Sequence, residues 1–162
     1  MKNLIAITIA LFTLVAAGLA QTTAPLTISG TVAPIATITM ASQSGYNTLD
    51  LVNGATAQIV GIAKETCNDK LGYKVTLTSA NAAATAQAVL KGAISGNPDS
   101  VNYSIIYNAV PVTLVSGSAT VTTAVAKTVA AGLQKNLAVT LAGGWLTADT
   151  YSDTITLTIA GN

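Results

Sequence analysis

Few side chains in this sequence can do acid–base or nucleophilic chemistry. The chain contains no histidine and no arginine, and charged residues make up only 8% of its 162 residues. Histidine is the commonest general base and metal ligand, so its absence argues against an ordinary hydrolase or a zinc enzyme. We therefore expect a protein that is not an enzyme and that uses no cofactor.

Cys67 is the single cysteine, so it cannot form a disulfide within its own chain. We expect a buried, small apolar side chain, because free cysteines are among the most buried residues. A disulfide between two chains is an alternative, and a nucleophilic role is the weakest one, because no histidine is present to generate the thiolate.

Asp149 and Asp153 lie four residues apart. Two carboxylates without further oxygen ligands are weak evidence for a calcium site, so we expect these side chains to form turn and strand-start hydrogen bonds instead.

The charges are sparse and balanced. Seven lysines stand against six acidic residues, a formal net charge of +1, whereas a nucleic-acid-binding protein needs a basic face. One cluster of charged residues is predicted to be a solvated rim; it consists of Lys64, Glu65, Asp69, Lys70 and Lys74. The single tryptophan, Trp145, is expected to be a partly buried loop anchor, with an exposed contact residue as the alternative.

The first twenty residues have the organisation of a signal peptide. Lys2 precedes an apolar run over residues 4–16, and Gly18 and Ala20 place small residues at the −3 and −1 positions of a cleavage site. An uncleaved N-terminal anchor is the alternative. Cleavage after Ala20 leaves residues 21–162, which contain no second apolar run long enough to span a membrane. The sequence thus predicts an exported protein.

The remainder of the chain is predicted to consist mainly of strands. Apolar and polar residues alternate over 26–32, 73–78 and 155–159, the pattern of strands with one buried face. Less regular candidates are residues 36–40, 48–51, 57–67, 101–107, 110–115, 120–129 and 136–141. Turn-forming pairs separate these segments. Residues 80–90 form either a helical turn or a loose connection. About eight or nine short antiparallel strands predict one all-β domain, a β-sandwich.

Two prolines bracket the first alternating segment. Pro25 and Pro34 flank it, and proline cannot donate a hydrogen bond to a sheet. The segment is therefore separable from the rest of the chain. It is either an edge strand of its own domain or an arm that pairs with another molecule.

Four stretches of the sequence together resemble the pilins of the chaperone–usher pathway. They are residues 26–34, 66–69, 73–77 and 149–159. The alpha-type major subunits, similar to colonization factor antigen I, lack an internal disulfide, as this chain must; the spore-coat-U-like pilins share the tyrosine followed by an alternating last strand. The resemblance implies an immunoglobulin-like sandwich that lacks its final strand. It also implies a signal peptide over 1–20, a donor-strand extension over 21–33 and a pilin domain over 34–162.

In this family, another chain supplies the missing strand. A periplasmic chaperone lends it first, and the N-terminal extension of the next subunit then replaces it. The resemblance implies a donor strand over 23–32, with Leu26, Ile28, Gly30 and Val32 on the face that enters the groove. The implied acceptor groove is lined by residues 35–40 and by Ile155, Leu157 and Ile159.

The function that the resemblance implies is that of a major pilin. Such a protein is a structural subunit of a bacterial surface fimbria, polymerises head-to-tail and supports adhesion or biofilm formation. Its partners would be identical subunits, the periplasmic chaperone and the outer-membrane usher, with a tip adhesin as a further possible partner. The chain would pass through the periplasm to the cell surface. The alternative is a self-contained secreted β-sandwich, either a coat protein or a carbohydrate-binding module, that acts as a monomer.

Overall fold

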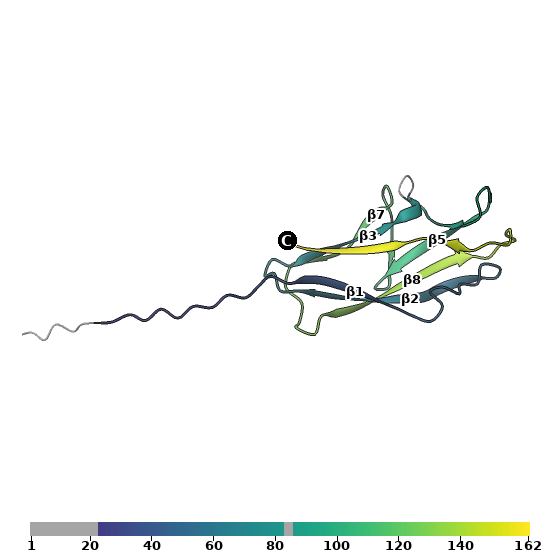
Figure 1. Ribbon diagram of the computed structural model, residues 1–162. Coiled ribbons are helices and arrows are strands. Elements are labelled where there is room, and N and C mark those ends of the chain that lie inside the picture. The colour runs from purple at the N-terminus through teal and green to yellow at the C-terminus, as the bar shows by residue number, and fades with distance from the viewer. Residues whose placement is uncertain (1–22, 83–85) are drawn as a thin grey trace, which may run out of the picture. The chain divides into compact units, whose positions relative to one another are not determined.

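The computed structural model describes residues 23–82 and 86–162 (Figure 1). Residues Ala33–Asn162 form one compact unit, which we call the body. Residues 23–32 belong to a separate unit and are called the arm. The predicted signal peptide lies outside the described residues. In the part of the chain that is described, no helix has both the length and the apolar character required to cross a membrane.

The body consists of two antiparallel sheets, and the predicted all-β sandwich is confirmed (Figure 1). The larger sheet has the strand order β1-β2-β8-β5-β4-β9, with β6 paired to β5, and the smaller sheet has the order β10-β3-β7. The strands are β1 (Ala36–Ser42), β2 (Gly54–Cys67), β3 (Tyr73–Ser79), β4 (Ala88–Gly92), β5 (Ser100–Tyr107), β6 (Val110–Val112), β7 (Ser118–Ala124), β8 (Leu133–Ala142), β9 (Tyr151–Ser152) and β10 (Ile155–Gly161). A short 3-10 helix, η1, covers Ala80–Ala82.

Alternating side chains of the two sheets form the core. On β3, every second residue from Tyr73 to Ser79 is buried, as the sequence pattern predicts. On β5 of the larger sheet, every second residue from Val101 to Tyr107 is buried as well. The side-chain period of two therefore directs one face of each strand into the space between the sheets.

Threonines dominate the outer face of the smaller sheet. Successive rows run across β10, β3 and β7, and they consist of Thr158, Thr76 and Thr120 in one row and of Thr156, Thr78 and Ser118 in the next. Threonine is β-branched and favours strands. This face thus forms strands without adding large apolar side chains to the surface.

Two ends of the body, which we call the base and the apex, contain the loops. The base comprises residues 68–72 and 125–132, together with the start of β1 and the end of β10. Asn162 ties it together, because its side-chain amide donates to the carbonyl groups of Leu71 and Ala124 at 3.0 and 2.9 Å. The apex comprises residues 43–53, 93–99 and 143–150.

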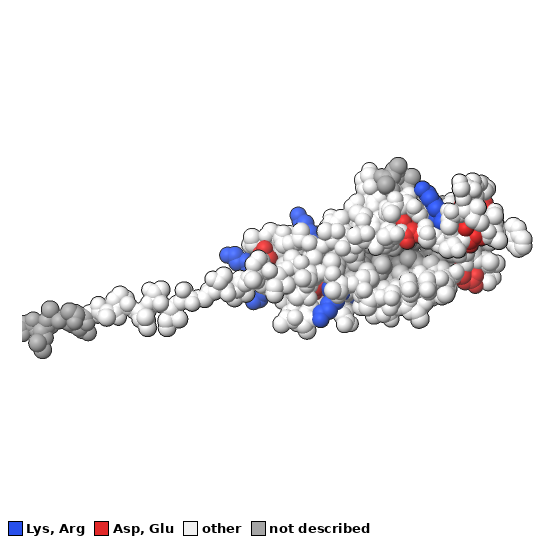
Figure 2. Space-filling view, in the orientation of Figure 1, with Lys and Arg blue, Asp and Glu red and all other residues white. Residues whose placement is uncertain are grey.

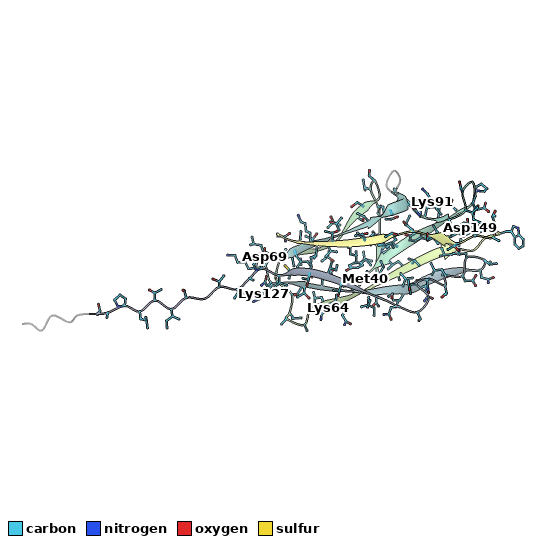
Figure 3. The ribbon with its side chains drawn as sticks, viewed as in Figure 1. Met40, Lys64, Asp69, Lys91, Lys127 and Asp149 are labelled. Atoms are coloured by element: carbon cyan, nitrogen blue, oxygen red, sulfur yellow. The ribbon has the colours of Figure 1, made fainter. Side chains whose placement is uncertain are left out.

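Hydrogen bonds join the three apical loops to one another. The amide of Gly144 donates to the carbonyl of Leu51 at 3.0 Å. The amide and hydroxyl of Thr147 both donate to Oδ2 of Asp99 at 2.7 Å. In Figure 3, Asp69 and Lys127 mark the base, whereas Lys91 and Asp149 mark the apex.

Several predicted strands differ from the structure. Residues 48–51 form no strand, because Oδ1 of Asp50 accepts hydrogen bonds from the amides of Val52 and Asn53 at 3.0 and 2.8 Å and closes a turn. β6 ends at Val112 and β7 at Ala124, both earlier than the predicted segments 110–115 and 120–129. Residues 80–90, for which the sequence did not distinguish a helical turn from a loose connection, contain η1 and the start of β4. Residues 26–32 form no strand in the single chain.

Candidate strand-acceptor site

β1 and β10 are neighbours, yet no hydrogen-bonded ladder joins them in the described chain. β1 is the edge strand of the larger sheet and β10 that of the smaller sheet. The two strands lie side by side, with the start of β1 and the end of β10 at the base (Figure 1). Each strand is paired on one edge only, with β2 and β3 respectively. We call the two unpaired edges the seam; such edges present free N–H and C=O groups that can pair with another strand.

The inward face of β10 is only partly covered. Ile155, Leu157 and Ile159 pack against the core but remain half-buried, whereas Thr156 and Thr158 are exposed. The alternation predicted over 155–159 is therefore observed. The structure places the three residues of the predicted acceptor groove on the inward face of an edge strand.

The inward face of β1 is also incompletely covered. Ile38 lies opposite Glu65 and Met40 opposite Ala63, two residues that are fully buried. Even so, Ile38 is half-buried and Met40, which is labelled in Figure 3, is 44% exposed. Gly61 makes room for Met40, because a Cβ at Gly61 would lie 2.6 Å from the methionine sulfur. Side chains that point toward the core but still reach solvent indicate that this side of the core lacks a cover.

A pocket of about 490 Å³ opens at the apical end of the seam. Leu49 and Leu51 contribute to it from the loop after β1, Leu90 from β4, and Tyr151 and Asp153 from the segment before β10. Its walls combine apolar and polar side chains and come from both sides of the seam. The pocket extends the region in which an added strand would contact apolar side chains.

Asp153 anchors the start of β10 to both sheets. Its Oδ2 accepts hydrogen bonds from the hydroxyls of Ser79 on β3 and Tyr103 on β5, both at 2.6 Å. Its Oδ1 accepts from the amides of Asn81 and Thr154 at 3.0 and 2.7 Å. Burial, together with the hydrogen bond to this carboxylate, raises the pKa of Tyr103. The strand-start hydrogen bond expected of Asp153 is therefore present.

Asp149 serves a different loop. Its Oδ2 accepts from the amide of Ile94 at 3.0 Å and from the side-chain amide of Asn97 at 2.7 Å, and these bonds fix residues 93–99. In the described part of the chain, no group of three or more histidine, cysteine, aspartate or glutamate side chains is placed to hold a metal ion.

The predicted solvated rim is wrong for Glu65, which is fully buried. Its Oε2 lies 2.8 Å from Nζ of Lys135 and accepts a hydrogen bond of 2.8 Å from Tyr73, and its Oε1 accepts from Tyr107 at 2.7 Å and from Thr122 at 2.9 Å. Glu65 follows the alternation of β2, which turns it inward between Ala63 and Cys67. The distant Lys135 and three hydroxyl groups compensate its charge, and no local pattern in the sequence reveals them.

Asn68 fixes the chain where it enters the body. Its side-chain amide donates to the carbonyl of Ala33 at 2.8 Å, and its Oδ1 accepts from the amide of Ile35 at 2.7 Å. The amide of Asn68 also donates to the carbonyl of Ile35 at 3.0 Å. One side chain thus holds the backbone on both sides of Pro34 at the base.

The arm, considered alone, presents the predicted donor residues to solvent. Leu26, Ile28 and Val32 are 84%, 87% and 84% exposed. Gly30 lies on the same alternation phase, and a Cβ placed on it would meet nothing within 4 Å. No strand is assigned to residues 23–32.

Two further predictions have opposite outcomes. Cys67 is 2% exposed and packs in the core with Tyr73 and Val75, so the expected buried thiol is confirmed. Trp145 is 98% exposed, so the expected loop anchor is wrong. It follows Gly143 and Gly144 in a loop whose hydrogen bonds come from neighbouring polar groups, which leaves the indole without a role in holding the fold.

Comparison with models of protein families gave no match, and no curated protein matches the chain. Among solved structures, the minor tip subunit HdaB of the E. coli Hda pilus is similar over 76% of this chain and 79% of that one, with 11% sequence identity and a TM-score of 0.36. A likeness at this level assigns neither a family nor a function. The functional argument therefore depends on the seam and the arm.

Proposed function

We propose that the chain is a structural subunit of a bacterial surface fimbria, and that subunits polymerise head-to-tail when the arm of one chain enters the seam of another. One observation carries this proposal. The body has two neighbouring unpaired edges with half-exposed inward side chains, and the same chain contains an extended segment whose alternating apolar side chains are exposed. Strand addition to a sheet edge is an established mode of recognition.

The dimensions of the arm and the seam agree. Ten extended residues from 23 to 32 span about 33 Å, and the seven residues of β10 span about 23 Å. The additional length suffices to reach the apical pocket. Because the side-chain period of a strand is two, Leu26, Ile28 and Val32 would all face the core, and Gly30 would allow a close backbone approach.

The expected energies are sufficient for a stable fibre. Burial of Leu26, Ile28 and Val32 contributes about 5–9 kcal/mol, and each new ladder hydrogen bond contributes about 0.5–1.5 kcal/mol. Since the added strand completes the acceptor's core, its release would be coupled to loosening of the body and would be slow. A head-to-tail contact of this kind does not close on itself, so its repetition produces a filament.

The entry of the chain into the body favours exchange between chains over self-completion. To lie beside its own β1, the arm would need a tight turn at residues 33–35. Asn68 instead holds the carbonyl of Ala33 and the amide of Ile35 on either side of Pro34. A hairpin turn would break these bonds.

The same proposal defines the partners. An uncovered seam is an aggregation hazard, so a periplasmic chaperone would cover it until an outer-membrane usher brings the next subunit to it. The polymer would then be exposed at the cell surface, where it would support adhesion or biofilm formation, with a tip adhesin as a possible end subunit.

Gel electrophoresis of the exported chain, residues 21–162, tests the proposal. Polymers should run as a ladder without heating and collapse to one band after boiling. Ile28→Asp should abolish the ladder, because it places a charge in the apolar core. Thr27→Asp, on the opposite face of the arm, is the matched control and should assemble.

Deletion of residues 21–33 should likewise prevent assembly, and the peptide 21–33 should raise the melting temperature of the shortened chain. A single unheated band for the unaltered chain would favour the monomeric alternative. Equal assembly of the Ile28→Asp and Thr27→Asp variants would show that the donor assignment is wrong.

A further inference from the structure

The charges of the body are separated between its two ends. Within residues 23–82 and 86–162, the half nearer the base carries five lysines and two acids, and the half nearer the apex carries one lysine and four aspartates. The basal set is Lys64, Lys70, Lys74, Lys127 and Lys135 with Glu65 and Asp69; the apical set is Lys91 with Asp50, Asp99, Asp149 and Asp153. Figure 2 shows most of the blue atoms over one end of the body and most of the red atoms over the other, with a few atoms of the opposite colour at each end.

The basal lysines are available to a partner. Lys135 is already paired with the buried Glu65, whereas Lys64, Lys70, Lys74 and Lys127 are all exposed. None of these four lysines forms a hydrogen bond or an ion pair with another described residue. Of the two basal acids among the described residues, Asp69 is half-buried and Glu65 is fully buried, so this end presents a net positive surface.

The loops stabilise the charged form of three apical aspartates, Asp50, Asp99 and Asp149. Hydrogen bonds from Asn53 lower the pKa of Asp50, those from Thr147 lower the pKa of Asp99, and those from Asn97 lower the pKa of Asp149. Each carboxylate is therefore part of a fixed loop. The apex presents negative charge at defined positions.

Both ends also expose large apolar side chains. Leu71, Val125 and Val129 are more than half exposed at the base. Val52, Ile94 and Trp145 are more than half exposed at the apex. Apolar side chains surrounded by charged groups are typical of protein contact surfaces. Two surfaces of opposite net charge attract each other and have the complementarity that specific interfaces use.

Covalent connection determines which surfaces meet in a fibre. Ala33 at the base is bonded directly to Val32, the last residue of the arm, so no spacer separates a donor's body from the acceptor's seam. If the donor's Val32 left the seam at the acceptor's base, the positive base of the donor would face the positive base of the acceptor. If it left at the acceptor's apex, the positive base of the donor would face a negative surface.

We propose that the base of one subunit docks on the apex of the next copy of this chain, with the exposed basal lysines facing the apical aspartates and with Trp145 covered. This inference rests on the proposed head-to-tail polymerisation and adds to it a second contact surface, outside the seam. Opposite charge at this surface would also accelerate the encounter of two subunits, because electrostatic steering raises association rates.

The single tryptophan provides a direct measurement of docking at the apex. In polymers of the exported chain, the emission of Trp145 should shift to shorter wavelength and acrylamide quenching should decrease. In the monomeric deletion variant completed by the peptide 21–33, both properties should stay as in an exposed indole, because the seam is filled but the apex is free. Equal quenching in the two samples would overturn the proposal.

Charge reversal tests the electrostatic part. The double variant Lys70→Glu, Lys127→Glu should polymerise about tenfold more slowly than the unaltered chain at low ionic strength, and the difference should shrink in high salt. Lys91→Glu is the matched control: it changes charge at the apex and should polymerise no more slowly than the unaltered chain. Equal rates for the double variant and the unaltered chain would overturn the inference.

The outcomes separate the two proposals. If the unaltered chain does not polymerise, both fail. If it polymerises and the peptide 21–33 stabilises the shortened chain, but Trp145 remains exposed and the lysine variants have no effect, only the docking of base on apex is wrong.

Discussion

β3 and β10 are neighbours in one sheet and have the same alternating sequence, yet the sandwich covers them to different extents. Val75 and Leu77 on β3 are fully buried. Ile159 and Leu157, the residues directly opposite them on β10, are half-buried. β3 is paired on both edges, with β10 and β7, whereas β10 is paired on one edge only.

A neighbouring strand, and not the sequence pattern alone, therefore determines how far an inward side chain is removed from water. Ile159 and Leu157 are as apolar as their partners on β3 and point the same way. They remain partly exposed because nothing covers the free edge of β10 in the single chain. The same argument applies to Met40 on β1. Mutations that compare the covered and uncovered strands therefore measure what the added strand would supply.

The largest expected effect is that of Leu77→Ala. It should lower the free energy of unfolding by about 3–4 kcal/mol, because it leaves a cavity in a closed core. Leu157→Ala should cost only about 1–2 kcal/mol in the shortened chain without the peptide, because the side chain is already half-exposed. Urea denaturation of both variants measures the two losses.

The same urea denaturation can be repeated with the peptide 21–33 bound to the shortened chain. With the peptide bound, the loss caused by Leu157→Ala should rise toward that caused by Leu77→Ala. Thr158→Ala, on the outward face of β10, should stay within about 0.5 kcal/mol under both conditions. Equal losses for Leu77→Ala and Leu157→Ala without the peptide would contradict the comparison.

A smaller loss of stability is expected from mutation of the buried polar network around Glu65, in which hydrogen bonds and an ion pair hold the covered part of the core together. Glu65→Gln should lower the free energy of unfolding by about 2–3 kcal/mol, because it leaves Lys135 without its buried counter-charge. The double variant Glu65→Gln, Lys135→Met should be more stable than the single variant, since the unpaired charge is then removed. Thermal and urea unfolding of the two variants checks this order.

The smallest effect is a loss of stability in acid. Burial alone would raise the pKa of Glu65, but hydrogen bonds from Lys135, Tyr107, Tyr73 and Thr122 outweigh it and hold the pKa below the ordinary value of 4.5. The unfolded chain therefore binds more protons as the pH falls through this range, so stability that is present above about pH 4.5 is lost below it. Glu65→Gln should flatten this part of the stability–pH curve, and an unchanged curve would contradict the assignment.

Local patterns were sufficient to predict much of the fold. The alternation over 73–78 and 155–159 identifies β3 and β10 and their inward faces, because a half-buried strand needs only a period of two. The sequence does not predict β4, which begins in the undecided segment 80–90, or β9, because both strands are short and lack clear alternation. The turn at Asp50 was missed because side-chain hydrogen bonds to the backbone outweigh a weak strand pattern.

Less of the candidate site could be predicted from the sequence. The alternation identifies Ile155, Leu157 and Ile159 as inward-facing, but it does not show that β10 lies at an edge, since that depends on which strands pair. The burial of Glu65 depends on Lys135, seventy positions away in the sequence. Trp145 lies in a loop after two glycines. A loop has no alternation of apolar and polar residues from which the exposure of a side chain could be predicted.

The threonine rows on the outer face of the smaller sheet have a consequence for the surface of the body. Between Lys74 and the apex, the outward side chains of β3 and β10 are hydroxyl-bearing and carry no charge. Hydroxyl groups of this kind do not titrate and attract few counter-ions, so this wall keeps the same hydration in fresh water, in brine and in mild acid. It also lacks the basic residues at which trypsin-like proteases cut.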